Sequence, residues 1–176
     1  MVYDLNGTTL STGGGSGMLN VLDHGFKGDG TTDNLAAFNA LIAAHPAETL
    51  YFPKGVYAFS GKLVFDQCYM ELDNAELKCT ASTKVDRFIE IRGKMYPPET
   101  PQQDMFIRGN GKVNATFKAD ACIAVARQNC TLIDHISIQN FQRYGICGKF
   151  TDLSMTTGDG QTEANLSYEL MVRNCM

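Results

Sequence analysis

Val21-Leu-Asp-His-Gly-Phe-Lys-Gly-Asp-Gly-Thr-Thr-Asp-Asn34 is the stretch that decides the fold of this 176-residue chain. It is followed by an amphipathic segment, 35–45, and by Leu50-Tyr-Phe-Pro-Lys-Gly-Val-Tyr57. In order, these stretches predict a short strand, a glycine-rich turn, a capped helix and a second strand with Pro and Gly in its exit turn. A strand, a helix and a strand therefore open the folded part of the chain.

The residue types of the turn and the helix support this order. Glycines can adopt a positive φ at little steric cost, and an aspartate can bond to the backbone of its own turn. The residues expected in these roles are Gly25, Gly28, Gly30 and Asp29. Thr32 is the expected N-cap, with Asp33 and Asn34 in the first helical turn. Pro46 disfavours helical geometry at His45 and predicts the helix end there. The helix should bury one apolar stripe, made of Leu35, Phe38 and Ile42.

Residues 21–65 resemble the opening of the pectate lyase superfamily, which includes polygalacturonase-like enzymes and many bacteriophage tailspikes. The resemblance implies an all-β fold, a right-handed parallel β-helix, whose N-terminal α-helix caps the first coil and shields it from edge pairing. In the family this segment is architecture. Seven residues are therefore expected to be structural rather than catalytic: Asp23, Gly25, Gly28, Asp29, Gly30, Thr32 and Asp33.

Beyond residue 49 the chain consists of short β-like runs with almost no helical periodicity. In one of them, alternation predicts that Met70 and Leu72 point inward, and that Tyr69 and Glu71 point outward. An apolar residue, a polar residue and then Asn or Gly recur along these runs. Because Asn and Gly tolerate the left-handed conformation, the pattern predicts corners of stacked coils at Asn74, Gly93, Gly109, Asn140 and Asn174.

The chain divides into two parts of different composition. Residues 1–17 are expected to be a flexible arm, because 11–17 is a Gly/Ser linker. Residues 18–176 should hold the capping segment and the first coils of the β-helix, at the front of a longer chain. Excursions from the coils are expected at 95–103 and 151–164.

Charge and composition restrict the partners. The net charge is −4 and the chain has no basic run, so nucleic acid is not an expected partner. No apolar run is long enough to cross a bilayer. The six cysteines lack CxxC spacing and the three histidines are scattered, so no metal and no cofactor are expected. The start of the chain lacks a secretory signal, which favours synthesis in the cytoplasm.

No catalytic residue can be assigned from the sequence. Polygalacturonase-like enzymes are recognised by Asn-Thr-Asp, Asp-Asp, Gly-His-Gly and Arg-Xaa-Lys elements on successive coils, and none of these elements is recognised here. Asp134 and His135 are adjacent, but neighbours on a strand point to opposite faces, so they should not share a site unless a turn separates them. Arg143 and Tyr144 fall in an expected loop, where a charged and aromatic pair could contact a sugar. They are the candidate binding residues.

Three functions fit these observations. The first is the N-terminal part of a phage tailspike or tail-fibre-like structural protein that recognises glycans on the host surface. The resemblance then implies a virion component and a homotrimer, with residues 1–17 docking to other tail proteins. The second is a polysaccharide lyase or glycoside hydrolase whose catalytic coils are absent or unrecognised. The third is a non-catalytic, extracellular glycan-binding module of a bacterium.

Overall fold

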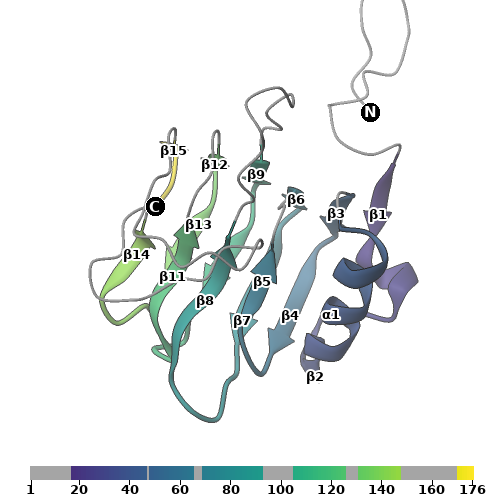
Figure 1. Cartoon of the computed structure of the whole chain (residues 1–176), viewed down its shortest axis with the longest axis horizontal. Helices are drawn as coiled ribbons and strands as arrows, with labels where there is room; N and C mark the ends of the chain where they lie inside the picture. Colours follow the sequence, from purple (N-terminus) through teal and green to yellow (C-terminus); the bar gives the residue numbers. More distant parts are fainter. Residues whose placement is uncertain (1–16, 47, 66–68, 93–104, 126–130, 148–169) are drawn as a thin grey trace, which may run out of the picture.

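The computed structural model describes residues 17–46, 48–65, 69–92, 105–125, 131–147 and 170–176. It confirms an all-β parallel β-helix: three parallel sheets run along one stack of coils. The stack begins at β1 and β2, where α1 lies, and reaches β15 at its other end (Figure 1). The arm predicted for residues 1–17, except Gly17, and the excursions predicted at 95–103 and 151–164 lie outside the described residues.

The second to fifth coils each contribute one strand to each sheet, in the same order. The first sheet contains β1 (Met18–Asn20), β3 (Thr49–Phe52), β6 (Tyr69–Leu72), β9 (Met105–Gly109), β12 (Thr131–Asp134) and β15 (Leu170–Arg173). The second sheet contains β2 (Asp29–Asp33), β4 (Gly55–Phe59), β7 (Ala75–Cys79), β10 (Lys112–Asn114) and β13 (Ser137–Gln139). The third sheet contains β5 (Leu63–Phe65), β8 (Val85–Ile91), β11 (Ala119–Val125) and β14 (Tyr144–Cys147).

The helix α1 (Leu35–Ala44) takes the place in the first coil that a strand of the third sheet takes in later coils. Its buried Phe38 ring lies 5.0 Å from the ring of Phe65 in β5, measured between centroids. Leu41 is buried beside it, whereas Leu35 and Ile42 are only half-buried. The helix therefore covers the end of the core, as predicted, and it ends at His45 before Pro46.

The predicted N-cap at Thr32 is wrong. Thr32 lies in β2, and its hydroxyl donates to the carboxylate of Asp29 over 2.7 Å. The N-cap is Asn34, whose buried amide bonds to the backbone of neighbouring segments instead of to the helix. The expected placement of Asp33 in the first helical turn is also wrong, because Asp33 pairs with Ala58 of β4 as the last residue of β2. Pairing with β4 therefore extends β2 as far as Asp33, directly before the N-cap Asn34.

The predicted turn residues act in different ways. Asp23 lies exposed in a short 3-10 helix, η1 (Val21–His24), which ends at Gly25 with a φ of 85°. Gly30 has a φ of 78° within β2, where the register with β4 is irregular. Gly28 does not adopt a positive φ. A Cβ atom there would lie 3.2 Å from Cα of Gly55, so Gly28 is needed for close contact between two chain segments.

The interior is a continuous apolar stack. Near α1 it is aromatic, with edge-to-face pairs among Phe26, Phe38, Phe52, Tyr57, Phe59 and Phe65. Farther along, it is filled by smaller residues such as Leu77, Ile107, Val113 and Ile133. Tyr69 differs from its sequence-based expectation. It alternates with the inward Met70, but it is buried against the ring of Phe106, 5.6 Å away between centroids.

The predicted corners are confirmed where the structure describes them. Asn74, Gly109, Asn140 and Asn174 have φ values of 51°, 115°, 55° and 51°, all in the left-handed region. Gly93 lies outside the described residues. Left-handed residues thus turn the chain from one sheet into the next. No helix in the described part of the chain is long and apolar enough to cross a membrane.

Asp33 joins the first coil, α1 and the second coil through its carboxylate. It accepts hydrogen bonds from the Ser60 hydroxyl at 2.6 Å, the Ser60 backbone N–H at 2.9 Å and the Leu35 N–H at 3.1 Å. Burial opposes ionisation of this group, but these hydrogen bonds prevail and lower its pKa below 3.8. The carboxylate therefore stabilises the folded state above the ordinary pKa.

We expect Asp33→Asn to lower the free energy of unfolding at neutral pH and to make it less sensitive to acid. The Asp33 contribution is fully present above pH 3.8 and is lost as the pH falls toward the lowered folded pKa. Guanidinium unfolding at pH 7, 4 and 3 measures the difference between the wild type and the variant. The difference should be nearly the same at pH 7 and pH 4 and smaller at pH 3. A difference that does not fall at pH 3 would contradict the role of the ionised carboxylate.

Candidate functional site

The predicted pair Arg143 and Tyr144 lies where the chain enters β14. Arg143 is in the bend before the strand and Tyr144 is its first residue. The Arg143 guanidinium carbon lies 5.2 Å from the centroid of the Tyr144 ring, and its Nη2 donates to the Tyr144 hydroxyl over 3.3 Å. Both side chains are exposed. The structure therefore brings the two predicted residues together on the surface.

Strand register connects this pair to a charged region of the third sheet. Tyr144 pairs with Ala121 of β11, and Ala121 pairs with Arg87 of β8. Because neighbouring strands lie about 4.8 Å apart, the backbones at Tyr144 and Arg87 are roughly 10 Å apart. In this row across the sheet, the methyl group of Ala121 is the only side chain between Tyr144 and the buried guanidinium of Arg87.

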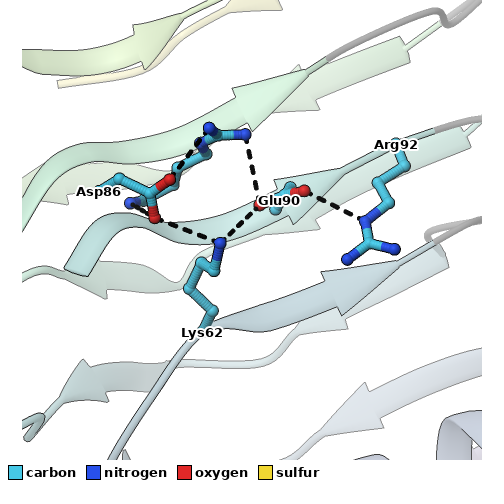
Figure 2. A network of polar contacts seen from close by, with 5 residues as sticks. Lys62, Asp86, Glu90 and Arg92 are labelled. Carbon is cyan, nitrogen blue, oxygen red and sulfur yellow. Dashed lines mark hydrogen bonds and ion pairs between the residues drawn. The ribbon is translucent and has the colours of Figure 1, made fainter. Parts of the chain in front are cut away.

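Figure 2 shows this charged region, with Lys62 and Arg92 directed at Glu90 and with Asp86 beside Lys62. Lys62 Nζ lies 3.1 Å from a Glu90 carboxylate oxygen and 3.2 Å from one of Asp86. Arg92 Nε lies 3.1 Å from the other Glu90 oxygen. Arg87 contacts Asp86 at 2.9 Å and Glu90 at 3.4 Å. Three cations thus surround two carboxylates. We call these five residues the charged network.

The electrostatics of the network favour ion pairing over acid catalysis. Burial opposes ionisation of Asp86, but Arg87 and Lys62 overcome it and lower the Asp86 pKa. Hydrogen bonds from Thr32 lower the pKa of Asp29, and a hydrogen bond from Asn174 lowers that of Asp134. A general acid in glycoside hydrolysis needs a raised pKa. Asp29, Asp86 and Asp134, like Asp33, have the opposite shift.

Asp134 and His135 do meet, contrary to the expectation for neighbours on a strand. His135 has a φ of 57° and forms a corner, so its Nδ1 lies 2.9 Å from a carboxylate oxygen of Asp134. The same carboxylate lies 2.8 Å from Arg173 and accepts from the Asn174 amide at 3.0 Å. These contacts join the coil of β12 to that of β15, so the group ties two coils together.

An open groove of about 330 Å³ follows the corner between the first and second sheets. It crosses four consecutive coils and has Lys54, Glu76 and Lys112 in its lining, with Lys112 Nζ 3.3 Å from Glu76. The groove has charged residues in its lining, and none of its lining residues belongs to the Arg143–Tyr144 pair. Within the described ranges, no cluster of three or more His, Cys, Asp or Glu residues is placed to hold a metal ion.

Sequence reasoning missed the charged network and two exposed aromatic residues, Phe117 and Phe141. The sequence held signals for the charged network. Arg87 and Glu90 interrupt an apolar run that pairing and hydrophobicity otherwise place in a strand. The expectation that no Arg-Xaa-Lys element occurs is wrong, because Arg92-Gly-Lys94 has this spacing. Arg92 belongs to the charged network, and Lys94 lies outside the described residues.

Comparison with known proteins gives a family and two similar folds. The model of a family described as "Rhamnogalacturonase A/epimerase, pectate lyase-like" matches residues 18–169.

The solved structure "Geobacillus virus E2 - ORF18" is similar with a TM-score of 0.53 and 17% identity, over 73% of this chain and 27% of that one. The bacteriophage Phi29 gene product 12 N-terminal fragment is similar with a TM-score of 0.52 and 14% identity, over 68% of this chain and 22% of that one. The chain thus spans about a quarter of either structure. The curated proteins searched by sequence include no match.

Proposed function

Because the chain belongs to the rhamnogalacturonase A/epimerase, pectate lyase-like family, we propose that it is part of a phage tailspike or tail-fibre-like protein. In this proposal the β-helix is a rigid support, and it presents residues that recognise a glycan on the host surface. The proposal includes a homotrimer in the virion and docking to other tail proteins through residues 1–17. The viral origin of the two similar structures supports it.

The observation that carries glycan recognition is the exposed Arg143–Tyr144 pair at the start of β14. An aromatic ring offers a flat apolar surface for the C–H face of a sugar, and its hydroxyl adds a polar contact. A guanidinium presents several donors in a fixed plane, which suits hydroxyl and carboxylate oxygens. Because β14 is held in the sheet by β11, the pair is pre-positioned and little ordering is needed on binding.

We expect Tyr144→Ala to weaken glycan binding at least about tenfold, which corresponds to about 1.4 kcal/mol. The wild-type chain is first tested against an array of bacterial surface polysaccharides, and the variant is then titrated against the polysaccharide that binds. Tyr51→Ala on the first sheet is the matched control and should retain binding. An unchanged affinity of Tyr144→Ala, at an unchanged melting temperature, would contradict this site.

Polysaccharide cleavage is the second candidate function, because the description of the matching family names a rhamnogalacturonase and an epimerase. The same bound polysaccharide distinguishes the two candidates. Binding without new reducing ends or unsaturated products favours recognition alone. Release of reducing ends or unsaturated products that is lost when a residue of the charged network is replaced would favour an enzyme.

A further inference from the structure

Asn110 and Gly111 are the two residues that connect β9 to β10. In the sequence, asparagine is followed directly by glycine only at 6–7 and at 110–111, and the first of these pairs lies outside the described residues. Such a pair has a chemistry of its own. Glycine has no side chain to hinder the approach of its backbone nitrogen to the side-chain carbonyl carbon of the preceding asparagine.

The fold requires glycine at position 111. A Cβ atom there would lie 2.3 Å from Cβ of Leu72 and 2.7 Å from its Cδ1, and Leu72 is buried in the core. Carbon atoms that are not bonded to each other normally stay about 3.5–4.0 Å apart. The Gly111 carbonyl also accepts from the Ser137 N–H at 3.0 Å, which fixes the segment against the next coil. Packing thus keeps an unhindered nitrogen directly after Asn110.

The two groups of the pair have no competing partner. The Asn110 side-chain amide and the Gly111 N–H form no hydrogen bond with the residues that the structure describes. By contrast, the side-chain amide of Asn114 donates to Glu76 over 2.7 Å, and its side-chain oxygen accepts from the Thr116 N–H at 3.0 Å. Asn110 is exposed and lines the open groove, so water reaches it. Asn110 is therefore available for reaction, whereas Asn114 is restrained.

We propose that Asn110 is a site of spontaneous deamidation in the folded chain, a modification that does not depend on glycan binding. The Gly111 nitrogen attacks the side-chain carbonyl carbon of Asn110 and forms a C–N bond. The bond from that carbon to the amide nitrogen breaks, and this nitrogen takes up the Gly111 proton and leaves as ammonia. The product is a five-membered succinimide. Water then adds to one of its two carbonyl carbons and gives aspartate or isoaspartate at position 110, with no oxidant or reductant.

The two products have different effects on the corner. Aspartate adds a carboxylate to a groove whose lining includes Lys54 and Lys112, so the new charge enters a site that already carries positive charge. Isoaspartate routes the main chain through the former side chain and lengthens it by one C–C bond, about 1.5 Å. Gly109 and Gly111, on either side, both lie against Leu72 and leave no room for a longer chain. The isoaspartate form therefore weakens the packing of this corner on the preceding coil.

Peptide mapping of the full, folded chain after storage at mildly alkaline pH tests the assignment, because chromatography separates the asparagine, aspartate and isoaspartate forms of a peptide. The peptide that contains Asn110 should convert to both products, while the peptide that contains Asn114 stays unmodified. Conversion should be slower at mildly acidic pH, where the Gly111 nitrogen loses its proton less readily. If Asn110 stays intact at alkaline pH, or converts no faster than Asn114, the proposal is overturned.

Asn110→Asp separates the effect of charge from that of the longer main chain. This variant carries the charge alone, so its melting temperature should stay within about 2 °C of the wild type. The isoaspartate form, isolated from stored wild-type protein, should melt at least about 4 °C lower. Asn110→Ser lacks the amide and should keep its melting temperature during the same storage. Equal melting of the isoaspartate form and the Asn110→Asp variant would overturn the effect on the corner.

Discussion

Gly109→Ala should lower the free energy of unfolding by about 3 kcal/mol or more, one of the two largest effects that we expect in this protein. Gly109 ends β9 with a φ of 115°. An added Cβ atom would lie 2.2 Å from the Leu72 carbonyl oxygen and 3.0 Å from the Leu72 carbonyl carbon. Both are backbone atoms of the neighbouring coil, so no side-chain movement can relieve the contact. The variant must separate β9 from β6 or change the corner.

Two matched glycine variants isolate the causes of this effect. Gly25 also has a positive φ, 85°, but nothing lies within 4 Å of a Cβ atom there. Gly25→Ala should therefore show conformational strain alone, about 1–2 kcal/mol. Gly17→Ala has neither the positive φ nor a close atom and should change stability by less than about 0.5 kcal/mol. Guanidinium unfolding of the three variants measures the series. If Gly109→Ala costs no more than Gly25→Ala, the close contact with Leu72 is not what makes glycine necessary.

The coil corners could be predicted from the sequence because their physical cause is local. A left-handed φ is unfavourable for most residues, so the chain has Asn at 74, 140 and 174 and Gly at 109. The helix end at His45 was predictable for the same reason, since Pro46 acts on its immediate neighbour. Backbone preferences of single residues are visible in a sequence without knowledge of the tertiary fold.

Features that depend on strand pairing were not predictable in this way. Thr32 and Asn34 are both good capping residues, and the pairing of Asp33 with Ala58 decides between them by extending β2. Tyr69 alternates correctly with Met70, but the ring of Phe106 on the next coil buries it. Both outcomes depend on residues at least 24 positions away, which alternation and capping rules do not include.

The candidate site shows the same division. Arg143 and Tyr144 were recognisable as a charged and aromatic pair next to each other in a loop. Phe117 was not recognisable as an exposed residue, because its place at a corner depends on a φ of 57° and on cross-coil bonds to Asn140 and Gln142. The charged network was also missed as a unit, since Lys62 precedes β5 and its partners lie on or after β8. The register of β5 with β8 brings them together.

Glu90→Gln should lower the free energy of unfolding by about 3 kcal/mol, because it leaves buried positive charge without its main counterion. The Glu90 side chain is 4% exposed and contacts Lys62, Arg87 and Arg92. Arg87 is 3% exposed, so water cannot replace the lost carboxylate there. Asp86, which contacts Lys62 and Arg87, would then be the one carboxylate left in the charged network. Glutamine keeps the size of the side chain, so the change tests charge rather than packing.

Glu71→Gln is the matched control for this prediction. Glu71 pairs with Arg108 at 2.6 Å on the first sheet, but the two side chains are 27% and 35% exposed. Because solvent screens such a pair, the control should cost no more than about 1 kcal/mol. Guanidinium unfolding at neutral pH compares the two variants, and equal small losses would show that burial does not make the network important for stability.

Glycan binding by the same Glu90→Gln protein then separates structure from recognition. A destabilised variant that still binds at low temperature identifies the network as a structural support in the part of the third sheet next to β11. A stable variant that loses binding would identify it as part of the ligand site, and would extend that site along the row from Tyr144 past Ala121 to Arg87. The burial of Glu90 and Arg87 favours the first outcome, because each charge already has partners within 3.4 Å and neither side chain is open to a ligand.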